Sequence, residues 1–195
     1  MKLVSLIAIA TLAATPALAH DQKIQKDPGS TTRTDTDSQQ MKGKASKATR
    51  SFTMAAASGN TLEVESSRIA LEKSQNQDVK SFAQMMIDDH TKVGEQMKST
   101  LQTAGLPPPA DKMTPKHQDV VDKLKQAGGN KFDGQYVAAQ LKAHDEAINL
   151  FSNYAKNGDN AELKQFAQAT LPSLEKHKTM VEDLRSKVTG GSATQ

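Results

Sequence analysis

Glu63, His90, His144 and His177 are the residues whose types and spacing in this sequence favour chemistry. Neutral imidazole is the usual protein ligand of borderline transition metals, and a carboxylate offsets the charge of the ion. Ionisable groups are costly to bury unless they are paired or bound. Three imidazoles and one carboxylate inside a helical bundle therefore predict a site for Zn, Fe, Mn or Cu, with these four residues as ligands.

All four residues continue apolar stripes of helical period. The apolar neighbours one or two turns further along the chain are Ala70 for Glu63, Met97 for His90, Phe151 for His144 and Val181 for His177. Counting residues from the nearest interhelical turn places the four at heights of ~18 to ~28 Å along their helices. Each is near the middle of its helix, so we expect them at one level of the core.

The elements that position these residues are four segments of helical periodicity, over about residues 51–73, 79–101, 132–157 and 163–184. Short polar or glycine-containing breaks separate the first from the second and the third from the fourth, so each pair forms an antiparallel hairpin. Between the hairpins, Gly105 and three prolines end a helix, and Thr114-Pro115 begins a short one that ends near Gly128.

The fold predicted is an all-α, ferritin-like four-helix bundle in which a long crossover with a short extra helix joins the hairpins. An up-down-up-down bundle with a decorated loop is the competing topology. We expect a signal peptide over residues 1–19, a disordered linker over 20–48, the bundle over 49–188 and a disordered tail over 189–195.

The export signal consists of Lys2, an apolar run and the small-residue triplet 17–19. It predicts an exported protein that is periplasmic, outer-membrane associated or secreted. The apolar run is too short to span a bilayer, so no transmembrane anchor is expected in the mature chain. A protein partner or a homo-oligomer remains open.

Composition excludes several classes of function. The sequence has no cysteine, which rules out thiolate chemistry. Removal of residues 1–19 takes away one charge and leaves 24 basic and 22 acidic residues. That balance predicts no particular partner, and no basic patch interleaved with aromatic residues indicates nucleic-acid binding. No glycine-rich phosphate loop is present.

Acidic residues near the stripes could orient the imidazoles; they are Glu65, Asp88, Asp89, Asp145 and Glu175. The two Glu-x-x-His pairs of a di-iron centre are absent. The methionines at 85, 86, 97 and 180 have the spacing of core residues rather than of copper ligands. His117, in the crossover helix, is expected to be exposed.

Several motifs resemble a bacterial exported family called domain of unknown function 4142. They are residues 55–59, Glu63-Val64-Glu65, residues 79–86, Asp89-His90, Phe132-Asp133 with Tyr136, Gln140 with His144, and residues 171–174 with His177. This resemblance, over about residues 51–184, implies a ferritin-like four-helix fold and an exported protein. It implies no reaction, because the family has no established activity.

The function predicted is therefore a metal-binding bundle with a redox or stress-protective role. The alternative is a non-enzymatic envelope or stress protein that binds a partner through its helical surface. In that case the polar cluster would only fix the register of the helices. The sequence defines neither a reaction nor the metal.

Overall fold

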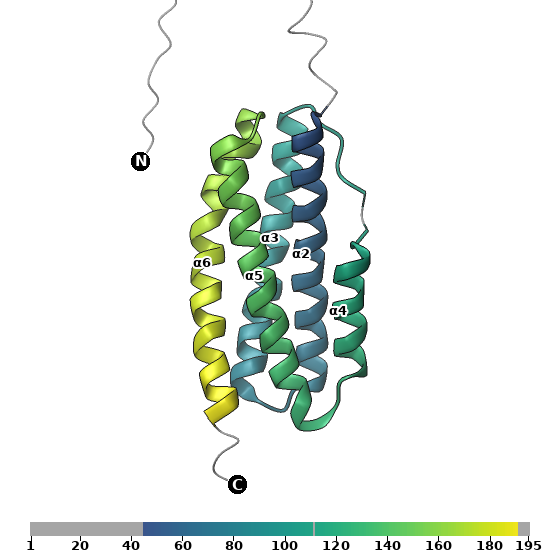
Figure 1. Cartoon of the computed structure of the whole chain (residues 1–195), viewed down its shortest axis with the longest axis vertical. Coiled ribbons are helices and arrows are strands. Elements are labelled where there is room, and N and C mark those ends of the chain that lie inside the picture. Colours follow the sequence, from purple (N-terminus) through teal and green to yellow (C-terminus); the bar gives the residue numbers. More distant parts are fainter. Residues whose placement is uncertain (1–44, 111, 191–195) are drawn as a thin grey trace, which may run out of the picture.

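The computed structural model describes residues 45–110 and 112–190, which form an all-α bundle (Figure 1). The elements are α2 (Lys47–Lys73), α3 (Gln77–Thr103), α4 (Pro115–Gln126), the 3-10 helix η1 (Gly129–Lys131), α5 (Phe132–Asn157) and α6 (Ala161–Gly190). The predicted signal peptide and most of the predicted linker lie outside the described residues. Within them, no helix combines the length and apolarity needed to cross a membrane.

The bundle extends slightly further at both ends than periodicity predicts. Helix α2 begins at Lys47, whereas the apolar stripe predicts a start near Ser51, and α6 continues to Gly190, two residues into the predicted tail. Ser46 caps α2 by accepting a hydrogen bond from the Thr49 amide. Thr49 is buried although it is polar, so an analysis of apolar periodicity misses the first turn.

Two short loops make the predicted hairpins. Between α2 and α3, the Asn76 side chain accepts from the amides of Asp78 and Val79 and so caps α3. Between α5 and α6, the Asn160 side chain accepts from the Leu163 amide in the same way. Because each loop is only three residues long, the helices of each pair pack antiparallel.

The hydrogen bonds between α2 and α5 decide the topology. Thr49 near the start of α2 bonds Tyr154 near the end of α5 at 2.6 Å, and Ser67 bonds Tyr136 at 2.9 Å. Helices α2 and α5 are therefore antiparallel, which makes α3 and α5 parallel. Parallel α3 and α5 require a long crossover, so the ferritin-like connection is present and the up-down-up-down alternative is wrong (Figure 1).

The described parts of the crossover, residues 104–110 and 112–131, run back along the outside of α2 (Figure 1). Gly105 has the positive φ of 67° that ends α3, and Thr114 caps α4 with Pro115 in its first turn, as predicted. Val121 and Leu124 of α4 are buried, and the Lys73 ammonium donates to the carbonyls of residues 125 and 127. The crossover is thus packed onto the bundle.

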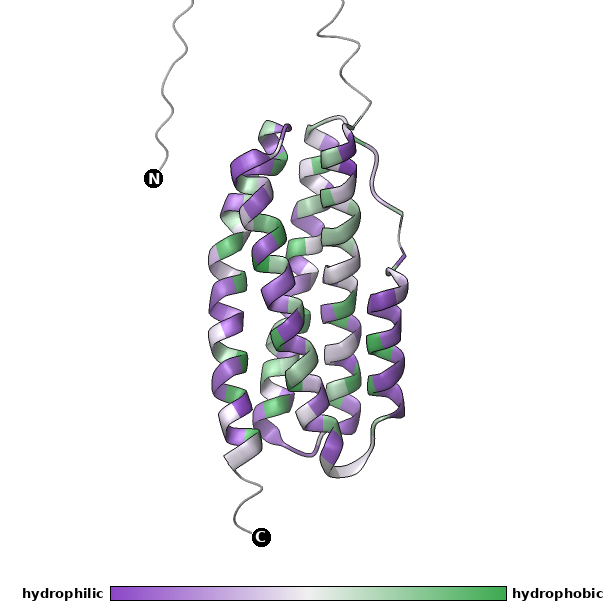
Figure 2. Ribbon diagram, in the orientation of Figure 1, coloured by the Kyte–Doolittle hydropathy of each residue, from purple (hydrophilic) through white to green (hydrophobic). Residues whose placement is uncertain are grey.

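Every helix carries both polar and apolar residues along its length (Figure 2), as expected for amphipathic helices with one face inward. The buried apolar residues form two clusters, one containing Met86 and Tyr136 and the other containing Met97 and Phe151. On α3, α5 and α6 the buried histidine lies between the residues of the two clusters. A layer of buried polar residues therefore interrupts the core near its middle.

Candidate metal centre

The structure brings His90, His144 and His177 together in the core. They come from α3, α5 and α6, their relative exposures are 4%, 0% and 2%, and one ring nitrogen from each lies within 4.8 Å of the others. The three ring centroids are 5.5 to 5.8 Å apart, which is close to an equilateral triangle. We call these residues the three-histidine cluster.

Each imidazole of the cluster has one nitrogen beside a fixed hydrogen-bond acceptor. His90 Nδ1 lies 3.1 Å from the amide oxygen of Asn60, and His144 Nδ1 lies 2.8 Å from the backbone carbonyl of Gln140. His177 Nε2 lies 3.2 Å from Asp89 Oδ2. A carbonyl or carboxylate oxygen only accepts, so each of these ring nitrogens carries the proton and donates.

The other nitrogen of each ring therefore has a free lone pair. His90 Nε2, His144 Nε2 and His177 Nδ1 are buried and have no hydrogen-bond partner among the described residues. Buried polar atoms are paired in the great majority of cases, so three such atoms in one cluster need an explanation. Fixing one nitrogen as a donor and leaving the other bare is how proteins prepare histidine to bind a metal.

Burial also keeps the cluster uncharged. Loss of solvation, reinforced by the neighbouring imidazoles, lowers the pKa of His90 to about 3. The same loss lowers the pKa of His144 to about 4, against the opposing hydrogen bond to Gln140. The pKa of His177 is lowered by burial, although Asp89 opposes the shift. All three rings are neutral at pH 7, the form that binds metal ions.

Glu63 lies at the same level but beside the triangle. Its side chain is 4% exposed, and Oε1 is 3.5 Å from His144 Nδ1, the nitrogen that donates to the Gln140 carbonyl. Burial raises the pKa of Glu63 to about 8, with a hydrogen bond from Gln140 opposing the shift. Glu63 and His144 are therefore both neutral at pH 7 and make no ion pair. Glu63 Oε2 is a further buried atom without a partner in the part of the chain that the structure describes.

Of the five acidic residues predicted to orient the imidazoles, Asp89 contacts one. Glu65 and Asp145 pair with Arg68 and Lys178 on the surface, at 2.8 and 2.7 Å. Asp88 accepts from Gln84, and Glu175 is exposed. Adjacent residues on a helix point about 100° apart, so Asp88 and Asp89 cannot both face His177.

Sequence reasoning missed Asn60 and the Gln140 carbonyl as partners of the rings. Asn60 is half-buried at the edge of the α2 stripe, three residues before Glu63, and that spacing places both on one side of α2. Its position also depends on Gly94, since a Cβ at residue 94 would come within 3.0 Å of the Asn60 amide nitrogen. A search for polar residues one turn from each ligand would have found Asn60.

His117 is half-buried, so the expected exposure is wrong. Its Nδ1 shares a 2.7 Å hydrogen bond with Ser58 Oγ, which also accepts from the Thr114 amide at 2.8 Å. Docking of α4 on α2 covers this histidine, and periodicity within α4 alone does not show it. His117 is outside the three-histidine cluster. The methionines at 86 and 97 belong to the apolar clusters, as predicted.

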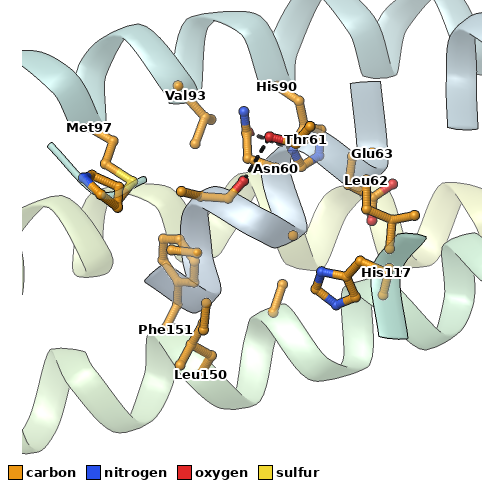
Figure 3. Close-up of a pocket in the computed structure, with 18 of the residues that line it drawn as sticks. Asn60, Thr61, Leu62, Glu63, His90, Val93, Met97, His117, Leu150 and Phe151 are labelled. Atoms are coloured by element: carbon orange, nitrogen blue, oxygen red, sulfur yellow. Dashed lines mark hydrogen bonds between the residues drawn. The ribbon is translucent and has the colours of Figure 1, made fainter. Parts of the chain in front are cut away.

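A pocket of about 660 Å³ reaches the site from the side that faces the crossover. Glu63 and His90 line it together with residues of α2, α3, α5 and the crossover (Figure 3). A small molecule in this pocket would therefore contact Glu63 and His90. Each of these residues has one buried polar atom without a partner among the described residues. We call this space the side pocket.

The sequence matches a protein family, and the fold is similar to that of a solved structure. Residues 34–184 match the family described as Domain of unknown function (DUF4142). No protein with a curated description matches the chain. The fold is similar to that of a DUF305 fragment from Deinococcus radiodurans, known from a crystal structure, with a TM-score of 0.63 and 16% identity over 73% of this chain and 98% of that chain. At that identity the likeness shows the fold alone.

Proposed function

The chain belongs to the DUF4142 family, and we propose that it binds one transition-metal ion through His90, His144 and His177. The observation that carries the proposal is the set of three bare nitrogens in the three-histidine cluster, each on a ring whose other nitrogen donates to a fixed acceptor. The His177–Asp89 pair has the arrangement of a carboxylate that orients a metal-bound imidazole.

The distances permit coordination after a small movement. Ring nitrogens at most 4.8 Å apart would lie within about 2.8 Å of an ion at their centre. The Zn–N bond is roughly 2.0–2.1 Å, so each ring would move inward by less than about 1 Å. Rotation of the imidazoles about their side-chain torsions provides a movement of this size without displacing the helices.

The donor set favours borderline ions. Three imidazoles suit Zn, Cu or Fe, and suit Mn less well, whereas Ca and Mg prefer oxygen ligands. Three protein ligands also leave a coordination position open, which is typical of catalytic rather than structural zinc sites. A redox or stress-protective role stays a prediction that depends on which of these ions binds.

We assign Glu63 to the charge balance of the site rather than to the triangle of ligands. A nearby cation favours the ionised form of a carboxyl group, so metal binding would lower the pKa of Glu63 and release its proton. The carboxylate would then offset one charge of the ion. Its orphaned Oε2 would then be able to accept a hydrogen bond from a water bound to the ion.

A purely structural polar cluster, the alternative prediction, would be expected to pair its buried atoms. Ser67 and Tyr136 show this behaviour nearby, because their buried hydroxyls bond each other across α2 and α5. The unpartnered atoms of the three-histidine cluster do not follow that pattern. They favour the metal-binding function.

Elemental analysis and titration test the proposal. The mature protein without an affinity tag should bind about one Zn²⁺, or a competing borderline ion, per chain, because it has a single cluster of this kind among the described residues. The triple variant His90→Gln, His144→Gln, His177→Gln should lose that binding. His117→Gln is the matched control, since His117 lies outside the cluster, and it should bind as wild type does. Equal binding by the triple variant would contradict the proposal.

A further inference from the structure

The side pocket exists because small residues line it. Helix α2 contributes Ala55, Ala56, Ala57 and Gly59, and α5 contributes Ala143 and Ala147. A Cβ added at Gly59 would meet only the His117 ring, at 4.0 Å, so the space beside α2 is open. Larger side chains at these positions would fill it, as they fill the rest of the core.

The pocket is lined by several polar residues, which include Asn60, Thr61, Lys98, Thr114 and His117. Two further pairs contrast in burial. Glu63 and His90 are buried and each carries an unpartnered atom. Lys116 and Glu146 lie at the surface, where the lysine Nζ is 2.7 Å from both carboxylate oxygens. The buried polar atoms that lack a partner are therefore at the end of the pocket beside the three-histidine cluster.

The wall beyond these buried groups is apolar over a considerable length. Figure 3 shows Glu63 and His90 toward one end and Met97 and Phe151 toward the other. The lining residues of α3 run from His90 to Leu101 and those of α2 from Ala55 to Glu63. At ~1.5 Å per residue these spans are about 16 and 12 Å, which suits an elongated apolar molecule.

The charge of the ion in the proposed metal site favours one kind of head group for such a molecule. Three neutral imidazoles bring no negative charge to a divalent ion. An anionic oxygen ligand would offset part of that charge and fill the open coordination position. A carboxylate has the required charge and donor atoms, and it is small enough for a site beside Ala143.

We propose that the side pocket binds a medium-chain alkyl or aryl monocarboxylate, with the apolar body along Met97 and Phe151 and the carboxylate beside His90, the member of the three-histidine cluster that lines the pocket. The position of the body follows from the pocket itself. The position of the head group rests on the proposed metal-binding function. The two parts can therefore fail separately, and the experiment measures each.

The position of the apolar body is tested first, by measuring how tightly metal-free protein binds the uncharged fluorophore N-phenyl-1-naphthylamine. The chain has no tryptophan, so protein fluorescence adds little background. Wild type should bind the fluorophore, and Ala147→Phe and Ala57→Leu should each weaken binding at least tenfold by filling the pocket from α5 and α2. Ala138→Phe, at an exposed position of α5, is the matched control and should bind as wild type does. Equal binding by all four proteins would overturn the proposal.

The head group is tested on protein loaded with Co²⁺, whose visible absorption responds to a change of ligand. Decanoate should change the spectrum of wild type at a concentration at least tenfold below that needed for acetate, and Ala147→Phe should abolish this preference. Equal effects of decanoate and acetate would overturn the assigned position of the body. If Co²⁺ gives no protein-bound spectrum while the fluorophore still binds wild type selectively, the metal-binding function and the head-group assignment fail and the apolar pocket stands.

Discussion

Asp89 on α3 fixes the orientation of His177 on α6 through a 3.2 Å contact between Oδ2 and Nε2. The contact joins the two hairpins of the bundle and holds the Nδ1 lone pair of His177 within the core, where none of residues 45–110 and 112–190 pairs with it. An ion pair between the same helices, Lys187 with Asp78 at 3.3 Å, lies on the surface. The Asp89–His177 contact, which lies toward the core, is the one that orients a candidate metal ligand.

Asp89→Asn should lower the affinity for the metal about 10- to 100-fold, because a weaker acceptor no longer fixes the proton on Nε2 of His177. Competition titration with a chromogenic chelator measures the change. Asp88→Asn is the control, since Asp88 is exposed and accepts from Gln84 rather than from an imidazole. If both variants bound metal as tightly as wild type, Asp89 would have no part in orienting the ligand.

Gly94→Ala should weaken metal binding several-fold by displacing Asn60 from His90, because the new Cβ would lie 3.0 Å from the Asn60 amide nitrogen. Gly134→Ala, at a helical position with open space around it, is the control. It should leave metal binding unchanged and stabilise the protein by about 0.5–1 kcal/mol through helix propensity. Identical metal affinities for the two variants would exclude a role for the Asn60 contact.

The stability of metal-free protein should fall as the pH drops below about 6.5. The folded state lowers the pKa of His90 to about 3 and of His144 to about 4, so the unfolded chain takes up protons first. Each histidine contributes a slope of at most about 1.4 kcal/mol per pH unit, starting near its unfolded pKa and ending near its folded pKa. Urea unfolding at pH 7 and pH 5 should show a smaller loss for the triple glutamine variant than for wild type. Equal losses would contradict the burial of neutral rings.

Glu63 should have the opposite pH dependence. Its pKa rises from 4.5 to about 8 on folding, so stability is full below pH 4.5 and decreases as the pH rises toward 8. Metal-free Glu63→Gln should therefore gain stability over wild type between pH 5 and pH 8. Glu65→Gln, whose carboxylate pairs with exposed Arg68, should gain none. A stability difference between Glu63→Gln and wild type that does not change with pH would count against burial of the protonated acid.

The sequence predicts the fold and the cluster because both depend on helical period. His90, His144 and His177 continue apolar stripes, so their common orientation and height follow from counting residues and locating loops. The topology needed contacts between residues far apart in sequence, such as Thr49 with Tyr154. The placement of Glu63 beside the triangle depends on lateral helix packing, which stripe positions do not specify.

His117 shows the same limit at the crossover. Its burial depends on where α4 docks on α2, and Ser58 determines that docking through hydrogen bonds to His117 and the Thr114 amide. Ser58 is a polar residue in the alanine-rich part of α2, and nothing in its own segment indicates a partner in α4. Contacts of this kind appear only when the packed helices are compared.

X-ray absorption at the zinc edge, on protein loaded with one equivalent of Zn²⁺, tests the central claim most directly. Coordination by His90, His144 and His177 predicts three imidazole nitrogens at about 2.0–2.1 Å, together with one further light ligand. The signal should disappear in the triple glutamine variant and persist in His117→Gln. A spectrum dominated by oxygen ligands, or one that the triple variant leaves unchanged, would show that the ion binds elsewhere and would contradict the metal centre.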